Sequence, residues 1–175
     1  MAKAFNQQLI EAVIAKNSGT ASNLTVGDVD FGAVAEFSGD AGRNTKITLT
    51  AKAESQNFKG EKEFHYTRLV SQSLITLTEV TAETTEVEDS VIIAKLNEDI
   101  VAKGYTDDEF KAEELTIQKT DAGEGNFNYT VSVNEGHIKF LAGQIAVYSY
   151  KKPAPEKVAL SGLEGELDAF TAPVA

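Results

Sequence analysis

The sequence predicts an α+β fold built from two repeated modules, each with one helix and a three- to four-stranded antiparallel sheet, followed by an extended C-terminal arm. Two segments have helical periodicity, several others alternate apolar and polar residues, and the order of these segments is the same in both halves of the 175-residue chain. We expect the first module over residues 1–80, the second, divergent copy over 81–150 and the arm over 151–175.

The two predicted helices span residues 4–17 and 89–103. Each has apolar residues at spacings of three and four, which is the pattern of one buried helix face. These residues are Phe5, Leu9, Ile10, Val13 and Ile14 in the first helix, and Ile92, Ile93, Leu96, Ile100 and Val101 in the second. Asn17-Ser18-Gly19 and Gly104 favour helix ends, and Asp89-Ser90 favours a helix start.

Strands are predicted where apolar and polar residues alternate. In the first module these are residues 29–37, 45–53 and 61–70, and in the second they are 113–120, 127–134 and 144–151. An additional strand is expected at 74–80, before an acidic, threonine-rich connector from Thr81 to Glu88. Because the loops between the strands are short, we expect antiparallel pairing.

Similar strings recur in the two halves at a nearly constant separation. Leu24-Thr25-Val26-Gly27-Asp28-Val29 corresponds to Tyr105-Thr106-Asp107-Asp108-Glu109-Phe110. Phe58-Lys59-Gly60 and Phe64-His65-Tyr66 correspond to Phe140-Leu141-Ala142-Gly143 and Tyr148-Ser149-Tyr150, and single-residue loop insertions explain the small drift in separation. The helices align equally well in two registers that differ by about one helical turn, so the register of the helices stays open.

The C-terminal segment differs in character from the modules. Its prolines cannot continue a central strand, because proline lacks the backbone donor that a ladder needs. Its apolar residues need a surface to pack on, yet they are too few for a core of their own, so we expect an arm that either covers its own sheets or reaches a neighbouring copy. The residues assigned to this intersubunit arm are Pro153, Pro155, Val158, Leu160, Leu163, Leu167 and Phe170.

The composition excludes several classes of function. Hydrophobic residues at 42% and charged residues at 25% indicate a globular protein. The 16 Lys and Arg residues against 27 Asp and Glu give a net charge of −11, which argues against direct nucleic-acid binding. No apolar run approaches the roughly 20 residues that cross a bilayer, and the N-terminus lacks the apolar core of a signal peptide. We expect a soluble cytosolic product without membrane contact.

Neither histidine is predicted to act in catalysis. His65 lies between Phe64 and Tyr66, whose side chains are expected to face the core, so the imidazole of His65 should point to solvent. His137 lies in a loop, and its separation from His65 is not the spacing of a metal-ligand pair.

Acidic clusters and glycine-rich runs have structural explanations. The Thr25-to-Asp28 and Thr106-to-Glu109 spacings match capping boxes, and no calcium-binding loop is present in the sequence. The chain has no cysteine, and its glycine-rich runs lack the signature of a phosphate-binding loop. We therefore predict a protein that is not an enzyme and that holds no metal or cofactor.

The combination of features resembles short virion structural proteins of large tailed bacteriophages, which are built from helix-plus-β modules. The likeness extends from the N-terminus to about Val70. It lies in the helix that ends near Gly19, in Leu24-Thr25-Val26-Gly27-Asp28-Val29-Asp30-Phe31-Gly32, in Asn44-Thr45-Lys46-Ile47-Thr48-Leu49-Thr50-Ala51, and in Phe58-Lys59-Gly60 with Phe64-His65-Tyr66-Thr67-Arg68. The resemblance implies a non-enzymatic particle component that is present in many copies.

On this basis we expect a multi-copy virion protein, assembled in the host cytoplasm, whose partners are itself and other virion proteins. A capsid decoration or other outer virion protein is the preferred placement, and a tail-tube or neck ring subunit is the alternative. A binding module of immunoglobulin type, for adhesion or carbohydrate, would require segments 4–17 and 89–103 to be non-helical. An enzyme would require a cleft in which acidic residues converge with His65 or His137.

Overall fold

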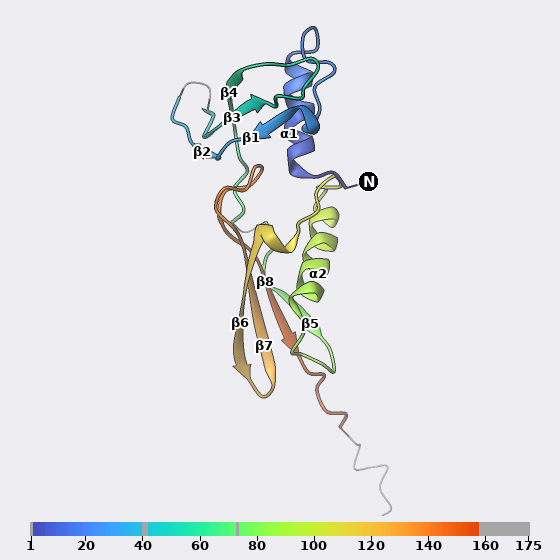
Figure 1. Ribbon diagram of the computed structural model, residues 1–175. Helices are drawn as coiled ribbons and strands as arrows, with labels where there is room; N and C mark the ends of the chain where they lie inside the picture. Colours follow the sequence, from blue (N-terminus) through green and yellow to red (C-terminus); the bar gives the residue numbers. More distant parts are fainter. Residues whose placement is uncertain (1, 40–41, 73, 158–175) are drawn as a thin grey trace, which may run out of the picture.

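A computed structural model describes residues 2–39, 42–72 and 74–157. It has an α+β fold with two helices and two sheets, in two units that are stacked end to end (Figure 1). The first unit begins with helix α1 (Phe5–Lys16), which buries one apolar face. The helix ends at Asn17, whose backbone N–H donates to the carbonyl of Val13 at 3.0 Å. The helix predicted over 4–17 is confirmed.

The sheet of the first unit follows a short 3-10 turn, η1 (Val26–Asp28). Its strands are β1 (Val29–Phe31), β2 (Ala35–Glu36), β3 (Thr45–Ala51) and β4 (Glu61–Tyr66). Strand β3 is central: β1 and β2 both pair with one of its edges and β4 pairs with the other, all antiparallel. The predicted strands at 45–53 and 61–70 therefore form, although the second ends earlier, at Tyr66.

The strand predicted at 29–37 is interrupted. Phe31 pairs with Leu49 and Ala35 pairs with Lys46, so residues 32–34 face only two residues of β3. The extra residue is accommodated as a bulge. At this point Gly32 lies so close to β3 that a Cβ atom on it would come within 2.9 Å of the Thr48 carbonyl oxygen.

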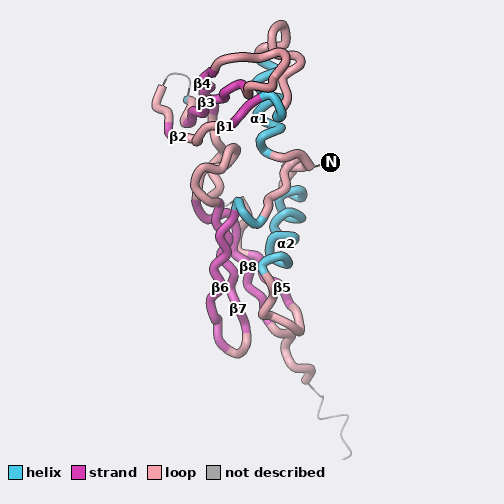
Figure 2. The backbone as a smooth tube through the Cα atoms, in the orientation of Figure 1, coloured by secondary structure: helices cyan, strands magenta, loops and turns pink. Residues whose placement is uncertain are grey.

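The second unit contains β5 (Thr78–Thr81), helix α2 (Asp89–Ala102), the 3-10 turn η3 (Ala112–Glu114), and strands β6 (Leu115–Gly123), β7 (Asn126–Val133) and β8 (Gly143–Lys151). The strand order is β5-β8-β7-β6. Strands β6, β7 and β8 form an antiparallel meander, as the short loops predicted. Helix α2 covers one face of this sheet (Figure 2).

Strand β5 corrects the prediction that both sheets are entirely antiparallel. It starts later than the predicted strand at 74–80, and it pairs parallel to β8, with Thr78 opposite Tyr148. The connection from β5 to β8 runs through α2 and the other two strands, so the short-loop argument does not apply to this pair. The boundary predicted between residues 80 and 81 falls inside β5, which belongs to the second sheet.

Each unit has its own hydrophobic core. In the first, α1 packs on β1 and β3 through residues such as Ile10 and Ile47. In the second, Ile92, Leu96 and Ile100 of α2 pack on β6, β7 and β8. Phe5 joins the second core although it lies at the start of α1, so the two units share a packed junction.

Candidate functional site

The predicted arm falls largely outside the described residues. Pro153 and Pro155 lie in the exposed stretch 152–157, which follows β8 and forms no regular element. The other residues assigned to the arm lie outside the described residues: Val158, Leu160, Leu163, Leu167 and Phe170. The role of these residues stays a prediction.

His65 lies on β4 as the alternation predicted. Its side chain is exposed, whereas the flanking Phe64 and Tyr66 are partly buried against the first core. The imidazole stacks on the ring of Phe37 with 3.8 Å between centroids, and its Nε2 lies 2.8 Å from a carboxylate oxygen of Glu63. The prediction of an exposed strand histidine is confirmed.

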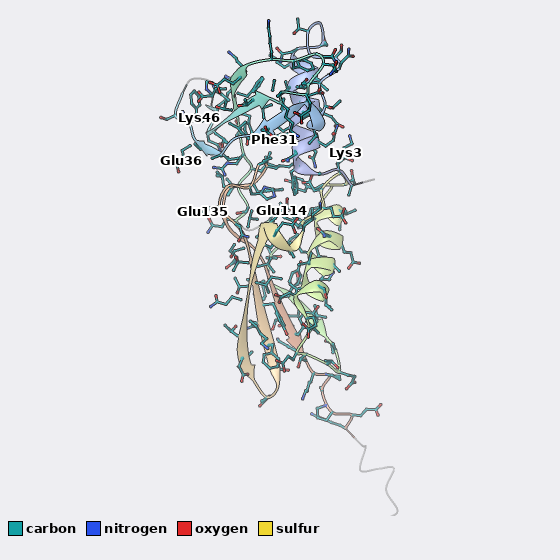
Figure 3. The ribbon with its side chains drawn as sticks, viewed as in Figure 1. Lys3, Phe31, Glu36, Lys46, Glu114 and Glu135 are labelled. Carbon is teal, nitrogen blue, oxygen red and sulfur yellow. The ribbon has the colours of Figure 1, made fainter. Side chains whose placement is uncertain are left out.

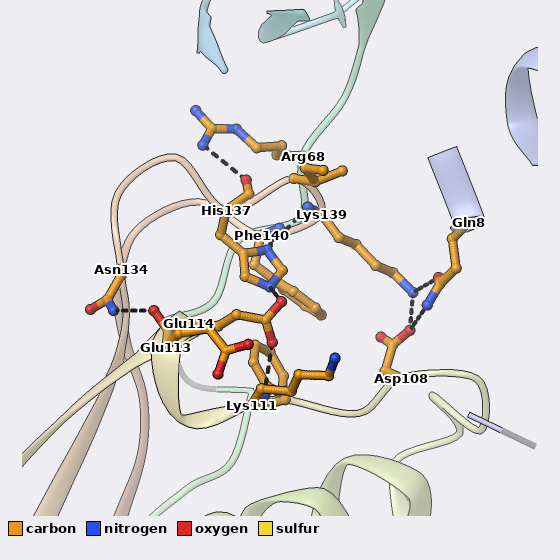
Figure 4. Close-up of polar contacts among 12 residues, drawn as sticks. Gln8, Arg68, Asp108, Lys111, Glu113, Glu114, Asn134, His137, Lys139 and Phe140 are labelled. Atoms are coloured by element: carbon orange, nitrogen blue, oxygen red, sulfur yellow. Dashed lines mark hydrogen bonds and ion pairs between the residues drawn. The ribbon is translucent and has the colours of Figure 1, made fainter. Parts of the chain in front are cut away.

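His137 lies in the loop between β7 and β8, at the junction of the two units (Figure 4). Its side chain is only 2% exposed. The Nδ1 atom accepts the backbone N–H groups of Lys139 at 3.1 Å and Phe140 at 3.0 Å. Because these bonds occupy the Nδ1 lone pair, the proton of the neutral ring lies on Nε2, which has no hydrogen-bond partner among the described residues.

Burial lowers the pKa of His137 to about 4 from an ordinary value of 6.5. Nearby charges act in both directions: the Asp108 carboxylate raises this pKa, whereas Arg68 and Lys139 lower it. Desolvation is the largest contribution, so the ring is neutral at neutral pH.

Glu114 is the acidic group that faces this ring. It ends the η3 turn, where its Oε2 accepts the backbone N–H of Lys111 at 2.9 Å, and its Oε1 lies 4.0 Å from Nε2 of His137. Burial raises the pKa of the Glu114 carboxyl. Glu114 and Glu135 both lie at the level where the two units meet (Figure 3).

The position of this turn corrects the second predicted capping box. In η1 the Asp28 carboxylate accepts both the backbone N–H and the hydroxyl of Thr25, at 3.0 and 2.6 Å, as predicted. The corresponding contact in the second unit involves Lys111 and Glu114, not Thr106 and Glu109. The similarity of Tyr105–Phe110 to Leu24–Val29 therefore predicted the second turn too early in the chain.

An open cavity of about 380 Å³ lies beside His137 and Glu114. Its wall contains the start of α1, the η3 turn and the loop after β7. The acidic residues that line it are Glu109, Glu113, Glu114 and Glu135, together with the single cation Lys111. The cavity therefore brings acidic side chains together with His137, which is the arrangement that an enzyme was expected to require.

A second buried polar group lies next to this cavity. The Asp108 side chain is fully buried, and its Oδ1 accepts hydrogen bonds from Lys139 Nζ at 2.5 Å and Gln8 Nε2 at 3.0 Å. Arg68, on the other side of the loop, donates from Nε to the Thr45 hydroxyl at 2.9 Å and from its guanidinium to the His137 carbonyl at 3.3 Å. These groups tie α1, the segment after β4 and the β7–β8 loop to one another.

The chemistry that these groups offer is limited. The Nδ1 lone pair of His137 is bonded to two backbone amides, so it cannot accept a proton from a substrate without losing a structural contact. The Asp108 carboxylate is paired with Lys139 through Oδ1, and its other oxygen, Oδ2, is buried and has no hydrogen-bond partner among the described residues. The Nε2–H donor of His137 lies beside the Glu114 carboxylate. In the described ranges, no group of three or more His, Cys, Asp or Glu side chains is arranged to hold a metal ion.

The sequence did not predict this junction. Gln8, Asp108 and Lys139 come from three segments, and Gln8 and Lys139 are 131 residues apart in the chain. No local spacing links them. The one available signal was the Gly136-His137 turn between two predicted strands, which indicates a loop but not its burial.

The open face of the second sheet is a separate feature. Opposite α2, the strands β6, β7 and β8 carry the cross-strand rows Thr116–Ser132–Gln144, Gln118–Thr130–Val147 and Thr120–Asn128–Ser149, in which Ser149 is buried and the other residues are exposed or partly exposed. None of these residues is charged, and neither helix covers this side of the sheet. We call this surface the uncharged face. Its border is charged: Glu79 of β5 pairs with Lys151 of β8.

The geometry defines an α+β protein with two helix-backed sheets and a polar junction between them. The chain belongs to a family of unknown function, DUF7941, because the family model matches residues 1–158. No curated protein and no solved structure matches the chain. Within the described residues, neither helix is long and apolar enough to span a bilayer.

Proposed function

We propose that this protein is a non-enzymatic structural component of a tailed-phage virion, present in many copies as a capsid decoration or other outer virion protein. Its localisation is the virion, assembled in the host cytoplasm, and its partners are further copies of itself and other virion proteins. The observation that carries this proposal is the uncharged face of the second sheet. The resemblance of the N-terminal half to phage virion proteins supplies the context.

The uncharged face suits contact between identical acidic chains. Each copy carries a net charge of −11, so two copies repel each other unless they meet where charge is low. Threonine, serine, asparagine and glutamine side chains on adjacent strands form such a surface here, and they can exchange hydrogen bonds with a partner without the desolvation of ions. Charged residues are depleted in the same way at the centre of protein interfaces.

The repeated-module prediction belongs to this proposal. Both units run from a helix through a 3-10 turn into an antiparallel three-stranded path. Their registers correspond: Ile47 faces Phe64 in the first sheet, and Tyr129 faces Tyr148 at the matching place in the second. The bulge between Val131 and Ser132 accounts for part of the drift between the two copies. These matches support a duplicated building block, to which β5 was added in the second unit.

The junction chemistry supports a structural role over an enzymatic one. The buried polar groups hold the two units together through hydrogen bonds, and the lone pair that a general base needs is occupied in His137. An immunoglobulin-type adhesion or carbohydrate-binding module is not supported, because segments 4–17 and 89–103 contain α1 and α2.

A tail-tube or neck ring subunit is the second candidate. Strand β6 lies at the edge of its sheet, and its outer edge has no strand partner in the described part of the chain. An unpaired edge of nine residues is a template for pairing with another sheet. Ring subunits that associate sheet to sheet would use this edge together with the uncharged face.

The test is the mass of the purified protein in solution. Light scattering should show assemblies well above the 18.8 kDa of one chain. Gln118→Lys and Gln118→Glu each place a charge on the uncharged face, so both should weaken assembly by about tenfold or more. Thr84→Lys adds the same charge at an exposed position away from this face and serves as the control.

Two results would contradict the proposal. A chain that stays monomeric at all concentrations would remove the self-association. Absence of the chain from purified particles of a phage whose genome encodes it, by mass spectrometry, would remove the virion placement.

A further inference from the structure

The first unit contains an apolar groove at the end of the molecule away from the second sheet. It has a volume of about 300 Å³ and lies between the C-terminal end of α1 and the hairpin that joins β3 to β4. The apolar side chains that line it include Val13, Ala21, Leu24, Leu49, Phe58 and Phe64. Phe58 and Phe64 are only partly buried, so aromatic surface remains open to a partner.

The rim of this groove is basic in an acidic protein. Lys59 and Lys62 line it together with a single acid, Glu61. Neither lysine makes an ion pair with a described residue, whereas Lys46 and Lys52 of the same unit lie within 4 Å of carboxylates. An apolar floor with two unpaired cations favours an occupant that combines apolar and acidic side chains.

One segment of this chain has that composition. Residues 158–175 lie outside the described residues, and their sequence interleaves apolar and acidic residues. The apolar positions are Val158, Leu160, Leu163, Leu167 and Phe170, and the acidic positions are Glu164, Glu166 and Asp168. The rest of the chain is richer in acids than in bases, so this match to a basic rim is local and not a general property of the surface.

The place where the described chain ends decides which copy supplies the segment. Residues 152–157 continue past β8, at the end of the molecule away from α1 and β4 (Figure 1). The groove is on the first unit, beyond the junction and the whole length of the second sheet. A neighbouring copy stacked in the same direction would bring its groove close to this end.

We propose that the groove of one copy binds residues 158–170 of the next copy, so that the chains are linked head to tail. This inference rests on the proposed function, because it requires the chains to associate with one another. It adds the surface that binds and the segment that is bound. Such a contact is heterologous: it joins two different patches, and repetition of it gives a closed ring or an open filament.

Disulfide trapping tests the contact directly, because the natural chain has no cysteine. One full-length chain carries Glu61→Cys on the groove rim, and a second, mass-tagged chain carries Gly162→Cys in the segment. After mixing and mild oxidation, we expect a disulfide-linked pair of one tagged and one untagged chain. A chain with Thr84→Cys, on the second unit, replaces the groove variant as the control and should give at least about tenfold less product.

A chain that carries both cysteines separates the two possible connections. At high dilution it should form little internal disulfide if the segment binds a neighbour. Rapid internal closure would overturn the inference in favour of a segment that folds back on its own groove.

Charge exchange gives a second, independent readout. Lys59→Glu with Lys62→Glu should weaken assembly by about tenfold, and Glu164→Lys with Glu166→Lys on the same chain should restore most of it. Assembly that persists without any groove disulfide would overturn this inference and leave the proposed function intact. A chain that remains a monomer by light scattering would defeat both.

Discussion

At the scale of single residues, His137 makes folding depend on pH. Its pKa is about 4 in the folded protein against 6.5 in an exposed chain, so the unfolded state binds more protons between these values. The stability is fully present above pH 6.5 and is lost as the pH falls towards 4. The expected loss is about 3 kcal/mol. Urea unfolding followed by circular dichroism at several pH values measures it.

His137→Gln provides the matched variant, since glutamine can accept a backbone N–H but does not titrate. We expect lower stability at pH 7 and a flatter pH profile. Glu114 acts in the opposite direction, because a carboxyl group with a raised pKa in the folded state stabilises the fold as the pH falls. Both the natural protein and His137→Gln contain Glu114, so the difference between their pH profiles reports on His137. An equally steep profile in His137→Gln would show that other groups cause the effect.

The two histidines also show what local sequence can predict. The exposure of His65 follows from alternation along one strand, which is a property of neighbouring residues. The burial of His137 depends on Phe5 and Phe110, whose rings lie 4.4 and 5.4 Å from its own and come from two segments that are distant from it in the sequence. Contacts of this kind depend on the tertiary arrangement, and no spacing in the sequence encodes them.

At the scale of elements, the turn between β6 and β7 is the most demanding backbone. Gly123, Glu124 and Gly125 all have positive φ, at 82°, 56° and 71°. Gly123→Ala should therefore lower the free energy of unfolding by about 1 kcal/mol or more, since an L-residue is strained in this region. Thermal unfolding monitored by circular dichroism checks the change.

Gly19→Ala is the control for that substitution. Its φ lies outside the left-handed region, and a Cβ at Gly19 would meet nothing within 4 Å, so we expect little change or a small gain. Equal losses at Gly19 and Gly123 would mean that the turn conformation carries no special cost.

Sequence periodicity was sufficient to predict both helices and the strands β3, β4, β7 and β8, because their apolar residues repeat at a clear period. It failed where an element depends on a partner distant in sequence. The break between β1 and β2 arises from the facing strand β3, and the direction of β5 arises from its pairing with β8. A strand pattern specifies which face is buried, but not which neighbour it pairs with or in which direction.

At the scale of the whole molecule, the junction couples the two units. Phe5 of α1 packs in the core of the second unit, and the Tyr66 hydroxyl donates to the Ile138 carbonyl at 2.8 Å. The backbone N–H of Lys3 also donates to the Asp107 carbonyl at 2.7 Å. With a core in each unit and these links between them, the natural protein should unfold in one cooperative transition, in which the calorimetric and van't Hoff enthalpies agree.

Phe5→Ala should break this coupling. Removal of a buried phenylalanine costs about 3–5 kcal/mol, and here the loss falls on the contact between the units, so we expect two calorimetric transitions or a van't Hoff enthalpy below the calorimetric one. Leu96→Ala removes a fully buried side chain within the second core at a cost of about 2–5 kcal/mol, and it should lower the transition temperature while the junction still couples the units. If the natural chain already unfolds in two transitions, the junction contacts contribute too little free energy to couple the two cores. If Phe5→Ala still unfolds in a single transition, the coupling lies in the hydrogen bonds of Tyr66 and Arg68 instead.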